Sequence, residues 1–288
     1  MKYSISNWIY GDERLPDTFA RLRRYGYDGI ELRGEPRMYD VSTVNALCEE
    51  FKLSVLSIAG MYPWPTDSRD LANPNPVVRE RAREYLKETT DFAVAVGAPL
   101  VIVVPSPVAK AQPVGDVSTE EKWQAAYARE WQWAVESVRT AGAYAASRGI
   151  LLAIEPINRY ETFLVNSAEQ GIRFVSEVDS PAVRLHLDTF HMNIEEKDPA
   201  GAVRSAGDLL VNVHIADSNR EAVGRGHTDF KSIVRALKEI EYTRALTLEP
   251  LPPVPDPYIA IQMKRYRPLW DLYADECITR LKEYERTV

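Results

Sequence analysis

The stretch RLHLDTFHMNIEE, residues 184–196, combines a strand-like alternation with a polar end. Leu185 and Leu187 alternate with polar residues, which is typical of a β-strand with one apolar face. Asp188 stands where this strand should stop, and His191 follows three residues later. A carboxylate at such a place is either the cap of a turn or part of a binding site. The choice depends on how many similar units the chain contains.

Seven further β-rich runs accompany this one, and amphipathic helical patterns separate them. The eight runs are YSISNW from Tyr3, DGIEL from Asp28, LSVLSIA from Leu53, PLVIVV from Pro99, ILLAIE from Ile150, AVRLHLD from Ala182, LVNVHI from Leu210 and RALTLE from Arg244. Alternating strands and helices imply parallel pairing, and eight such units predict a single α/β domain over residues 1–288, a (β/α)8 TIM barrel. A doubly wound sheet is the alternative, but no Gly-rich fingerprint follows the first strand.

The helical patterns and the loops between them complete this prediction. The spacing predicts helices over 15–26, 42–51 with Ser42 as cap, 75–97, 118–149, 167–178, 198–206 and 229–240, and a long terminal helix from about Pro257. Long loops follow the first, third, fourth and eighth strands. Because loops at the carboxyl ends of the strands build the active site of such barrels, we expect the site there.

Composition narrows the class of partner. The 288 residues carry a formal net charge of -7 without blocks of positive residues, which argues against nucleic acid or an anionic membrane and favours a small molecule. Cys48 and Cys277 both lie in predicted helices and suggest no disulfide framework, so a reducing compartment fits. The sequence shows no secretory leader pattern and no apolar run near the roughly 20 residues of a membrane span. We therefore expect a cytoplasmic protein without a membrane segment.

Four polar side chains converge at the carboxyl ends of the last four predicted strands. They are Glu155, Asp188, His214 and Glu249. Three carboxylates gathered without a cation would repel one another at a cost of several kcal/mol. Oxygen ligands with one imidazole predict one divalent cation, Mn²⁺ first, with Mg²⁺ or Co²⁺ as alternatives. Under this hypothesis Glu155 and Glu249 are also the candidate catalytic bases.

Other residues near the predicted mouth allow a functional or a structural interpretation. His186 shares the strand face of Asp188 one layer deeper, so we expect a packed, hydrogen-bonded core histidine. Trp8 and Trp64 are candidate walls of a substrate pocket, whereas Trp123 is expected to pack on the barrel. Gly224 and Gly226 follow the seventh strand, where barrels often hold phosphate, but a turn explains them equally well.

The segments AIEPINRYE, HLDTFHMNIEE, VHIADSNREAVGRGHTDF and LTLEP resemble the signature of the xylose isomerase-like sugar isomerase and epimerase superfamily. They are most similar to the ketose 3-epimerases of the tagatose and psicose type. The resemblance is strong in the second half of the chain. The first half matches in strand order and in the segments GYDGIEL and VGAP.

This resemblance implies a role for each matching residue. The metal ligands would be Glu155, Asp188, His214 and Glu249, and the groups that hold the substrate's oxygen atoms would be Glu161, His191 and Arg220. The implied reaction is proton abstraction next to a ketose carbonyl through a metal-bound enediolate, with inversion at C3. Glu155 and Glu249 would take the proton from one face and return one to the other.

Several alternatives share the same chemistry or the same fold. A lyase acting on a 3-oxo sugar, like a C-glycoside deglycosylase catalytic subunit or inosose dehydratase, would expel a substituent instead, and a hydroxypyruvate-type aldose-ketose isomerase would need only another substrate pose. A DNA-repair endonuclease would need a histidine-rich zinc cluster and a basic groove, which four histidines and the acidic balance disfavour. A non-catalytic binding barrel would not need two flanking carboxylates. The aromatic residues of EKWQAAYAREWQWAVESV are compatible with an oligomer interface, although core packing against the barrel is the commoner explanation. We expect a homo-oligomer, dimer or tetramer, or a hetero-oligomer if the protein is a deglycosylase subunit.

Overall fold

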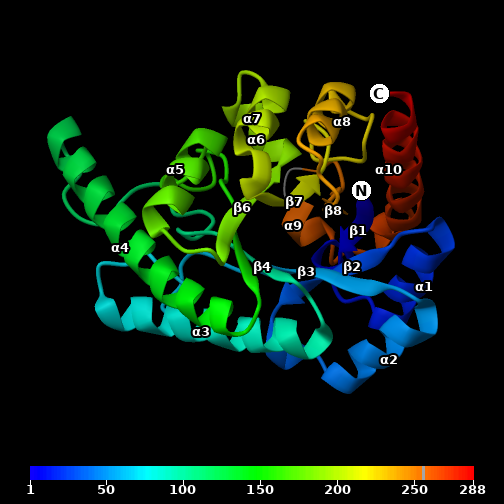
Figure 1. Ribbon diagram of the computed structural model, residues 1–288, viewed down its shortest axis with the longest axis horizontal. Coiled ribbons are helices and arrows are strands. Elements are labelled where there is room, and N and C mark those ends of the chain that lie inside the picture. Colours follow the sequence, from blue (N-terminus) through cyan, green and yellow to red (C-terminus); the bar gives the residue numbers. More distant parts are fainter. Residues whose placement is uncertain (255–256) are drawn as a thin grey trace.

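The computed structural model describes residues 1–254 and 257–288, in which eight parallel strands close into a barrel in sequence order (Figure 1). Each strand overlaps the run of sequence that predicted it, so the prediction of a TIM barrel is confirmed. The strands are β1 (Lys2–Ser6), β2 (Gly29–Gly34), β3 (Ser54–Gly60), β4 (Leu100–Val103), β5 (Leu151–Ile154), β6 (Val183–Asp188), β7 (Leu210–Ile215) and β8 (Ala245–Leu248).

Helices surround the barrel and connect its strands (Figure 1). They are α1 (Leu15–Tyr25), α2 (Val41–Phe51), α3 (Pro76–Val96), α4 (Glu120–Ser147), α5 (Ala168–Val178), α6 (Thr189–Glu195), α7 (Pro199–Ala206), α8 (Phe230–Glu239), α9 (Pro257–Ala260) and α10 (Arg267–Thr287). The short helix α6 was not predicted. The predicted long terminal helix is present as α10, but its predicted start at about Pro257 was wrong, because α9 ends at Ala260 and α10 begins only at Arg267. Part of the long loop after β8, residues 255–256, lies outside the described residues.

The start of α2 corrects a predicted cap. Asp40, and not Ser42, caps this helix, because its carboxylate accepts a hydrogen bond from the Thr43 backbone N–H at 3.0 Å. The Ser42 hydroxyl donates to the same carboxylate at 2.7 Å. A carboxylate accepts more hydrogen bonds than a hydroxyl, and its charge suits the positive end of the helix dipole. The sequence DVST therefore begins its helix one residue before the predicted start.

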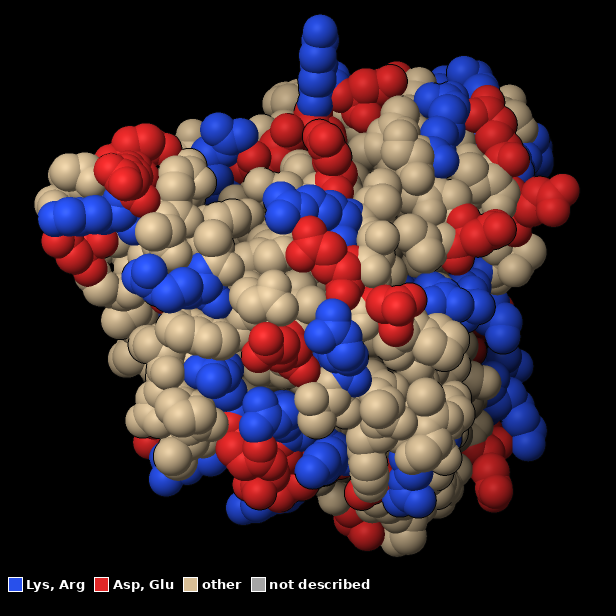
Figure 2. Space-filling view, turned by 60° about the vertical axis from the view of Figure 1, so that its left-hand side comes forward, with Lys and Arg blue, Asp and Glu red and all other residues tan. Residues whose placement is uncertain are grey.

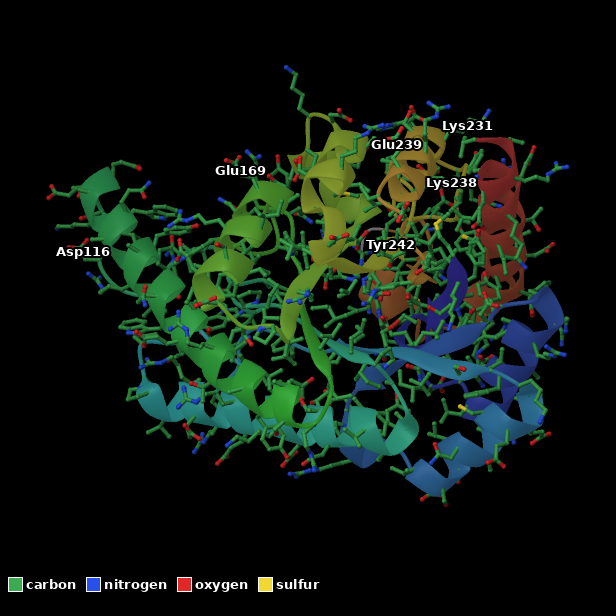
Figure 3. The ribbon with its side chains drawn as sticks, in the orientation of Figure 1. Asp116, Glu169, Lys231, Lys238, Glu239 and Tyr242 are labelled. Atoms are coloured by element: carbon green, nitrogen blue, oxygen red, sulfur yellow. The ribbon has the colours of Figure 1, made fainter. Side chains whose placement is uncertain are left out.

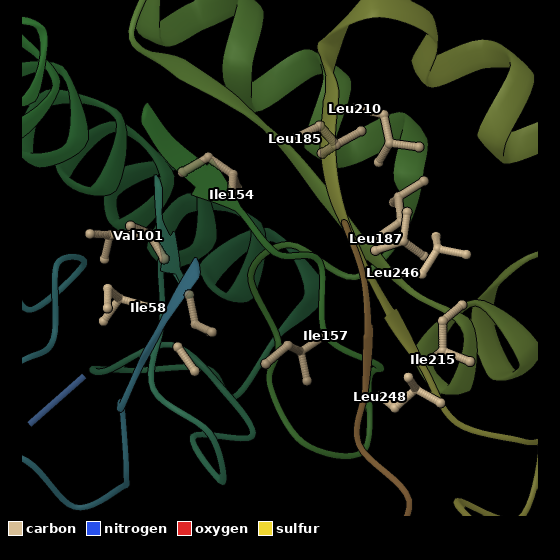
Figure 4. Packing of buried hydrophobic residues seen from close by; sticks show 14 of the residues in the cluster. Ile58, Val101, Ile154, Ile157, Leu185, Leu187, Leu210, Ile215, Leu246 and Leu248 are labelled. Carbon is tan, nitrogen blue, oxygen red and sulfur yellow. The ribbon is translucent and has the colours of Figure 1, made fainter. Parts of the chain in front are cut away.

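The outward faces of the strands are apolar and point toward the helices. β4 is apolar on both faces, and its Leu100 and Ile102 form a separate cluster with Ala153 and Val211. Leu185 and Leu187 of β6 belong to the same buried cluster as Phe174 of α5, and Figure 4 shows them with Ile154 and Leu248 of other strands. Burying this layer stabilises the fold by roughly 25 cal/mol for each Å² of apolar surface removed from water. The leucine alternation of residues 184–188 therefore packs the helices and leaves the other face of the strand to the barrel interior.

The inward face of the strands is unusually polar for a barrel core. Ser4 and Thr247 share a hydrogen bond of 2.7 Å between β1 and β8. Glu31 of β2 lies 3.1 Å from the ring of His214 on β7, a contact that crosses the barrel because these strands are not neighbours. Such interiors are ordinarily filled by branched apolar side chains. Here polar side chains extend from the middle of the barrel to its mouth.

The outer surface carries both signs of charge. On the face shown in Figure 2, basic and acidic side chains are interspersed over the whole view. Asp116 lies beside the first turn of α4 at the edge of the molecule, where it pairs with Lys122 at 2.5 Å (Figure 3). Among residues 1–254 and 257–288, no helix has the length and apolar character needed to cross a membrane. Cys48 and Cys277 are both free thiols.

Candidate metal centre and active site

The four predicted metal ligands meet at the carboxyl end of the barrel. Glu155 directly follows β5, Asp188 ends β6, His214 lies near the end of β7 and Glu249 directly follows β8. The Nδ1 atom of His214 lies 3.5 Å from Glu155 Oε1 and 3.3 Å from Glu249 Oε2. The register of β6 and β7 places Asp188 opposite His214. All four side chains are buried.

The two oxygens of the Asp188 carboxylate have different surroundings. Its Oδ1 accepts a hydrogen bond from the Phe190 backbone N–H at 2.7 Å and so begins α6. Its Oδ2 is buried without a hydrogen-bond partner among the described residues and lies 3.6 Å from His191 Nε2 and 3.6 Å from Arg220 Nη1. The capping interpretation is therefore confirmed for Oδ1, and Oδ2 remains available for the predicted binding site.

The atoms at this centre fit a divalent cation. Asp188 Oδ2 and His214 Nδ1 are both buried without a hydrogen-bond partner in the described part of the chain, although buried polar atoms are nearly always paired. Ligand atoms of Glu155, Asp188 and His191 lie within 4.8 Å of one another, and so do those of Glu31, His214 and Glu249. Carboxylate oxygens with an imidazole nitrogen form a donor set that Mn²⁺, Mg²⁺ or Co²⁺ accepts.

Burial and neighbouring charges shift the pKa values of the ionisable side chains at the centre. Burial opposes a charge on His214, but the carboxylates of Glu249 and Glu31 hold the pKa of its ring well above the ordinary value. Burial would raise the pKa of Glu155, but His186 and His214 hold it well below its usual range. Burial raises the pKa of Glu249 to about 7. Two flanking carboxylates with separated pKa values are suited to act as an acid and a base.

Glu31 belongs to the centre, although the sequence did not mark it as a functional residue. Its carboxylate lies 3.1 and 3.2 Å from Nε2 of His214 and accepts a hydrogen bond from the Ser57 hydroxyl at 2.6 Å. An acceptor at Nε2 keeps the proton there and leaves Nδ1 to face Glu155 and Glu249. The available signal was an acid between Ile30 and Leu32, since a charge inside an apolar strand needs a buried partner.

The three predicted substrate-binding residues surround the same mouth. Nδ1 of His191 lies 2.8 Å from Asn158 Nδ2, which also donates to Glu161 Oε1 at 3.0 Å. Asn158, which the sequence did not indicate, thus positions both residues. Nη2 of Arg220 donates to Glu249 Oε2 at 3.4 Å, and its backbone adopts the left-handed conformation, with φ of 62°.

His186 is buried as expected, but the expected hydrogen bonding was wrong. Neither ring nitrogen has a hydrogen-bond partner among the residues described. Nε2 lies 3.5 Å from Glu155 Oε1, and the ring meets that of His214 edge-on with centroids 4.1 Å apart. Burial lowers the pKa of His186, so the ring favours its neutral form. The histidine therefore supports the floor of the site below Glu155.

Of the three tryptophans considered above, Trp8 and Trp64 line the cavity as predicted and Trp123 does not. Trp8 lines the cavity at the mouth and donates from Nε1 to Glu249 Oε1 at 2.5 Å. Trp64 lines the same cavity and is 38% exposed. Trp123 stacks on Tyr127 of α4 with ring centroids 5.3 Å apart and does not line the cavity.

The cavity over the centre has a volume of about 390 Å³ and is bounded on one side by three paired loop segments. The backbone N–H of Trp64 donates to Val108 O at 3.0 Å, and that of Val108 donates to Tyr62 O at 2.8 Å. The Ala109 N–H donates to Glu161 O at 2.6 Å. We call these segments, residues 62–64, 108–110 and 161–162, the loop ribbon.

A buried ion cluster braces this ribbon. The ammonium of Lys110 lies 2.8 Å from Asp70 Oδ2 and 2.6 Å from Glu130 Oε2, and its side chain is 2% exposed. It also lies 5.6 Å from the ring of Trp64 and 5.5 Å from that of Phe163. The cluster ties the loop after β3, the loop after β4 and helix α4 to one another, so the cavity wall is formed before a ligand binds.

Replacing Lys110 with methionine should lower the free energy of unfolding by about 3–5 kcal/mol, because Asp70 and Glu130 would remain buried without their cation. Urea denaturation measures the change. The matched control is Lys122→Met on the exposed surface, whose ion pair with Asp116 should contribute at most about 1 kcal/mol. Equal effects of the two substitutions would contradict the bracing role.

Comparison with known proteins gives concordant matches. The family described as "Xylose isomerase-like TIM barrel" matches residues 19–267. An L-ribulose 3-epimerase of Methylomonas sp. (strain DH-1) is 33% identical over 88% of this chain and 84% of its own. A 3-dehydro-D-guloside 4-epimerase of Escherichia coli K12 is 28% identical over 84% of this chain and 89% of its own.

A solved structure of D-allulose 3-epimerase from Methylomonas sp. in complex with D-allulose superposes with a TM-score of 0.80. It is 28% identical in sequence, and the match covers 99% of this chain and 97% of the other. Family match, identity and fold all agree with the barrel described above. The chain belongs to the xylose isomerase-like TIM-barrel family, in which its relatives include enzymes named ketose 3-epimerases.

Proposed function

We propose that this protein is a divalent-metal-dependent sugar epimerase that inverts the carbon next to a ketone, C3 of a ketose in the first instance. One observation carries the proposal. Two buried carboxylates, Glu155 and Glu249, approach the same nitrogen of His214 from strands that are separated by two others in the barrel. The 3-epimerase names of the relatives support the position of the inverted carbon.

In this proposal Glu155, Asp188, His214 and Glu249 hold the cation, which when bound polarises the ketone and acidifies the neighbouring C–H. Glu155 and Glu249 lie on the two sides of the sugar. One of them removes the proton at an Oε atom while the other, protonated, returns a proton to the opposite face.

Positioning residues complete the proposed reaction. Arg220 stabilises negative charge on the sugar oxygens as the proton leaves. His191 and Glu161, which Asn158 holds in place, bind hydroxyl groups of the sugar. Water has limited access to the reacting carbon, because the side chains of the four proposed metal ligands are all buried.

We further propose that the physiological cation is Mn²⁺, that residues 1–288 form one domain and that the enzyme works in the cytoplasm. Trp123 and Tyr127 on α4 pack against the core but stay only half buried, and their exposed parts support a proposed homodimer or homotetramer. Light scattering of the purified protein distinguishes these assemblies from a monomer.

NMR in deuterated water tests the proposed reaction. The Mn²⁺-loaded protein is incubated with free ketoses, and deuterium incorporation is followed at the carbon next to the ketone. Appearance of the C3 epimer with deuterium at C3 supports the proposal. Formation of an aldose, with deuterium at C1 of the ketose, would instead indicate a hydroxypyruvate-type isomerase. The absence of exchange on any keto sugar would reject both the epimerase and the isomerase.

A lyase is the second candidate, and the wide apolar wall of the cavity favours it. Removal of the same proton can expel a β-substituent of a 3-oxo sugar, and a leaving group would need room beside the ribbon. Such an enzyme, if it is a deglycosylase subunit, could work in a hetero-oligomer. Release of the leaving group from a 3-oxo-glycoside, seen by NMR, separates this reaction from inversion.

Affinity for Mn²⁺ should fall as the pH is lowered from about 8 to about 6. Burial raises the pKa of Glu249 to about 7, and neighbouring carboxylates raise that of His214, so a cation must displace protons that lower pH adds. Each displaced proton changes the dissociation constant by roughly tenfold per pH unit. Calorimetric titration of the metal-free protein measures this slope. Glu249→Gln should flatten it, and a pH-independent affinity would contradict the assignment.

A further inference from the structure

The cavity has polar side chains at one end and apolar side chains along the other. At the polar end His214 contacts Glu155 and Glu249, and Arg220 contacts Glu249. Glu161, joined to His191 through Asn158, adds one acid from the loop ribbon to the lining. The lining that comes from β4 and from the loops after β3, β4 and β5 is mostly apolar and includes Met61, Pro63, Trp64, Ile102, Val108 and Ile157. A sugar chelated at the polar end must therefore direct its remaining part along apolar surface.

The loop ribbon offers few backbone groups to a sugar. The N–H groups of Trp64, Val108 and Ala109 already donate to carbonyl groups within the ribbon. Because Lys110 and its two carboxylate partners hold these segments together, the pairing does not open easily. The side chains that the ribbon presents to the cavity thus decide what it binds.

A free ketose fits this wall poorly. It carries a hydroxyl group on nearly every carbon, and each hydroxyl that loses water without gaining a partner costs about 1–3 kcal/mol. An apolar group against the same wall gains roughly 25 cal/mol per Å² of buried surface. A volume of about 390 Å³ lies in the range of about 300–1,000 Å³ in which pockets bury drug-sized ligands.

We propose that the substrate is a keto sugar that carries an apolar substituent, an aromatic or alkyl group joined through an oxygen atom, at the end away from the metal ligands. This inference rests on the proposed function and names the substrate class of that same site. Tyr62 lines the same cavity beside Gly60, and its buried hydroxyl adds no exposed polar group to this wall.

A phosphorylated sugar is a poorer candidate for this site. In the loop after β7, the carboxylate of Asp217 accepts hydrogen bonds from the backbone N–H groups of Ser218 at 2.7 Å, Gly224 at 2.7 Å and Thr228 at 3.1 Å. These amides would otherwise be available to a phosphate, but an internal anion already occupies them. Of the two interpretations of Gly224 and Gly226, these contacts favour the turn over the phosphate site, because Asp217 already accepts from the N–H groups of Ser218, Gly224 and Thr228.

Two matched compounds test the inference: a ketohexose and the same ketohexose with a benzyl ether on its terminal oxygen. With the Mn²⁺-loaded protein, the benzyl ether should show a kcat/KM for deuterium exchange at least about tenfold higher. Equal values, or a preference for the free ketose, would overturn the inference while leaving the proposed function intact.

Binding measurements keep the two hypotheses separable. If neither compound exchanges its proton, the proposed function fails, and calorimetry of the two compounds then decides the inference alone. A dissociation constant at least about tenfold lower for the benzyl ether upholds the apolar wall, and equal constants reject it.

A near-isosteric variant locates the preference. Val108→Thr places a hydroxyl on the wall with little change in shape, and it should lower the ratio of kcat/KM between benzyl ether and free ketose by about threefold or more. The matched control is Val114→Thr in the same loop, where the side chain is 45% exposed and does not line the cavity. An unchanged ratio in Val108→Thr would place the apolar group elsewhere and overturn the assignment to this wall.

Discussion

Glu155→Gln and Glu249→Gln should each lower the rate of interconversion of the two epimers by about 10²- to 10⁴-fold. Each variant lacks the base that faces one of the two epimers. The remaining carboxylate can still exchange the proton of the other epimer, so residual deuterium incorporation should be confined to opposite epimers in the two variants. NMR of each separate epimer in deuterated water measures this signature.

Loss of the cation must be separated from loss of a base in these variants. Asp188→Asn alters a proposed ligand that is not a base, so at saturating Mn²⁺ it should retain exchange of both epimers. Glu239→Gln on the exposed surface of α8, paired only with Arg204 in the described structure, controls for the charge change (Figure 3). Interconversion at the wild-type rate in either base variant would reject its role.

Glu31→Gln should weaken Mn²⁺ binding by about 10- to 100-fold without unfolding the protein. Glutamine keeps the size of the side chain and an acceptor for His214 Nε2 and the Ser57 hydroxyl. It removes the negative charge that makes the imidazole a stronger ligand through its other nitrogen. Titration of the metal-free variant by calorimetry gives the affinity, and its Tm shows whether the fold is kept.

A neighbouring acid provides the comparison for Glu31. Glu35→Gln changes the same charge just beyond β2, where the carboxylate pairs with Arg69 at 2.6 Å away from the centre. Its Mn²⁺ affinity should stay within about twofold of the wild type. If Glu31→Gln shows the same small change, the carboxylate does not tune His214.

The strands could be predicted from the sequence because some, such as β6, alternate apolar and polar residues, while others, such as β4, are short continuous apolar runs between turn signals. The four ligand candidates could be predicted because parallel strands in a barrel end at the same edge. Asp188 and Glu249 mark such ends directly, even though the capping hydrogen bond of Asp188 was invisible without coordinates. Local pattern and shared topology were sufficient for these features.

Contacts across the barrel could not be predicted in the same way. Glu31 meets His214 although 183 positions separate them in the chain, and neither residue's neighbours reveal the pairing. Asn158 lies in a loop, where its contact with His191 depends on how α6 follows β6. The contacts of Glu31 and Asn158 depend on tertiary geometry that no short window of sequence contains. The break between α9 and α10, by contrast, has a local signal that was overlooked, because Pro268 stands in the first turn of α10.

The divided carboxylate of Asp188 links two binding events. One oxygen begins the helix that carries His191, and the other, a proposed ligand atom of the ion, lies 3.6 Å from His191 Nε2 and from Arg220 Nη1. A cation that fixes the second oxygen therefore also fixes the orientation of a group that grips the sugar. Because the two binding equilibria are linked, the factor by which the bound ion increases the affinity for sugar equals the factor by which bound sugar increases the affinity for the ion. The ion and the sugar therefore do not bind independently, and the ion should bind most tightly while a sugar is bound.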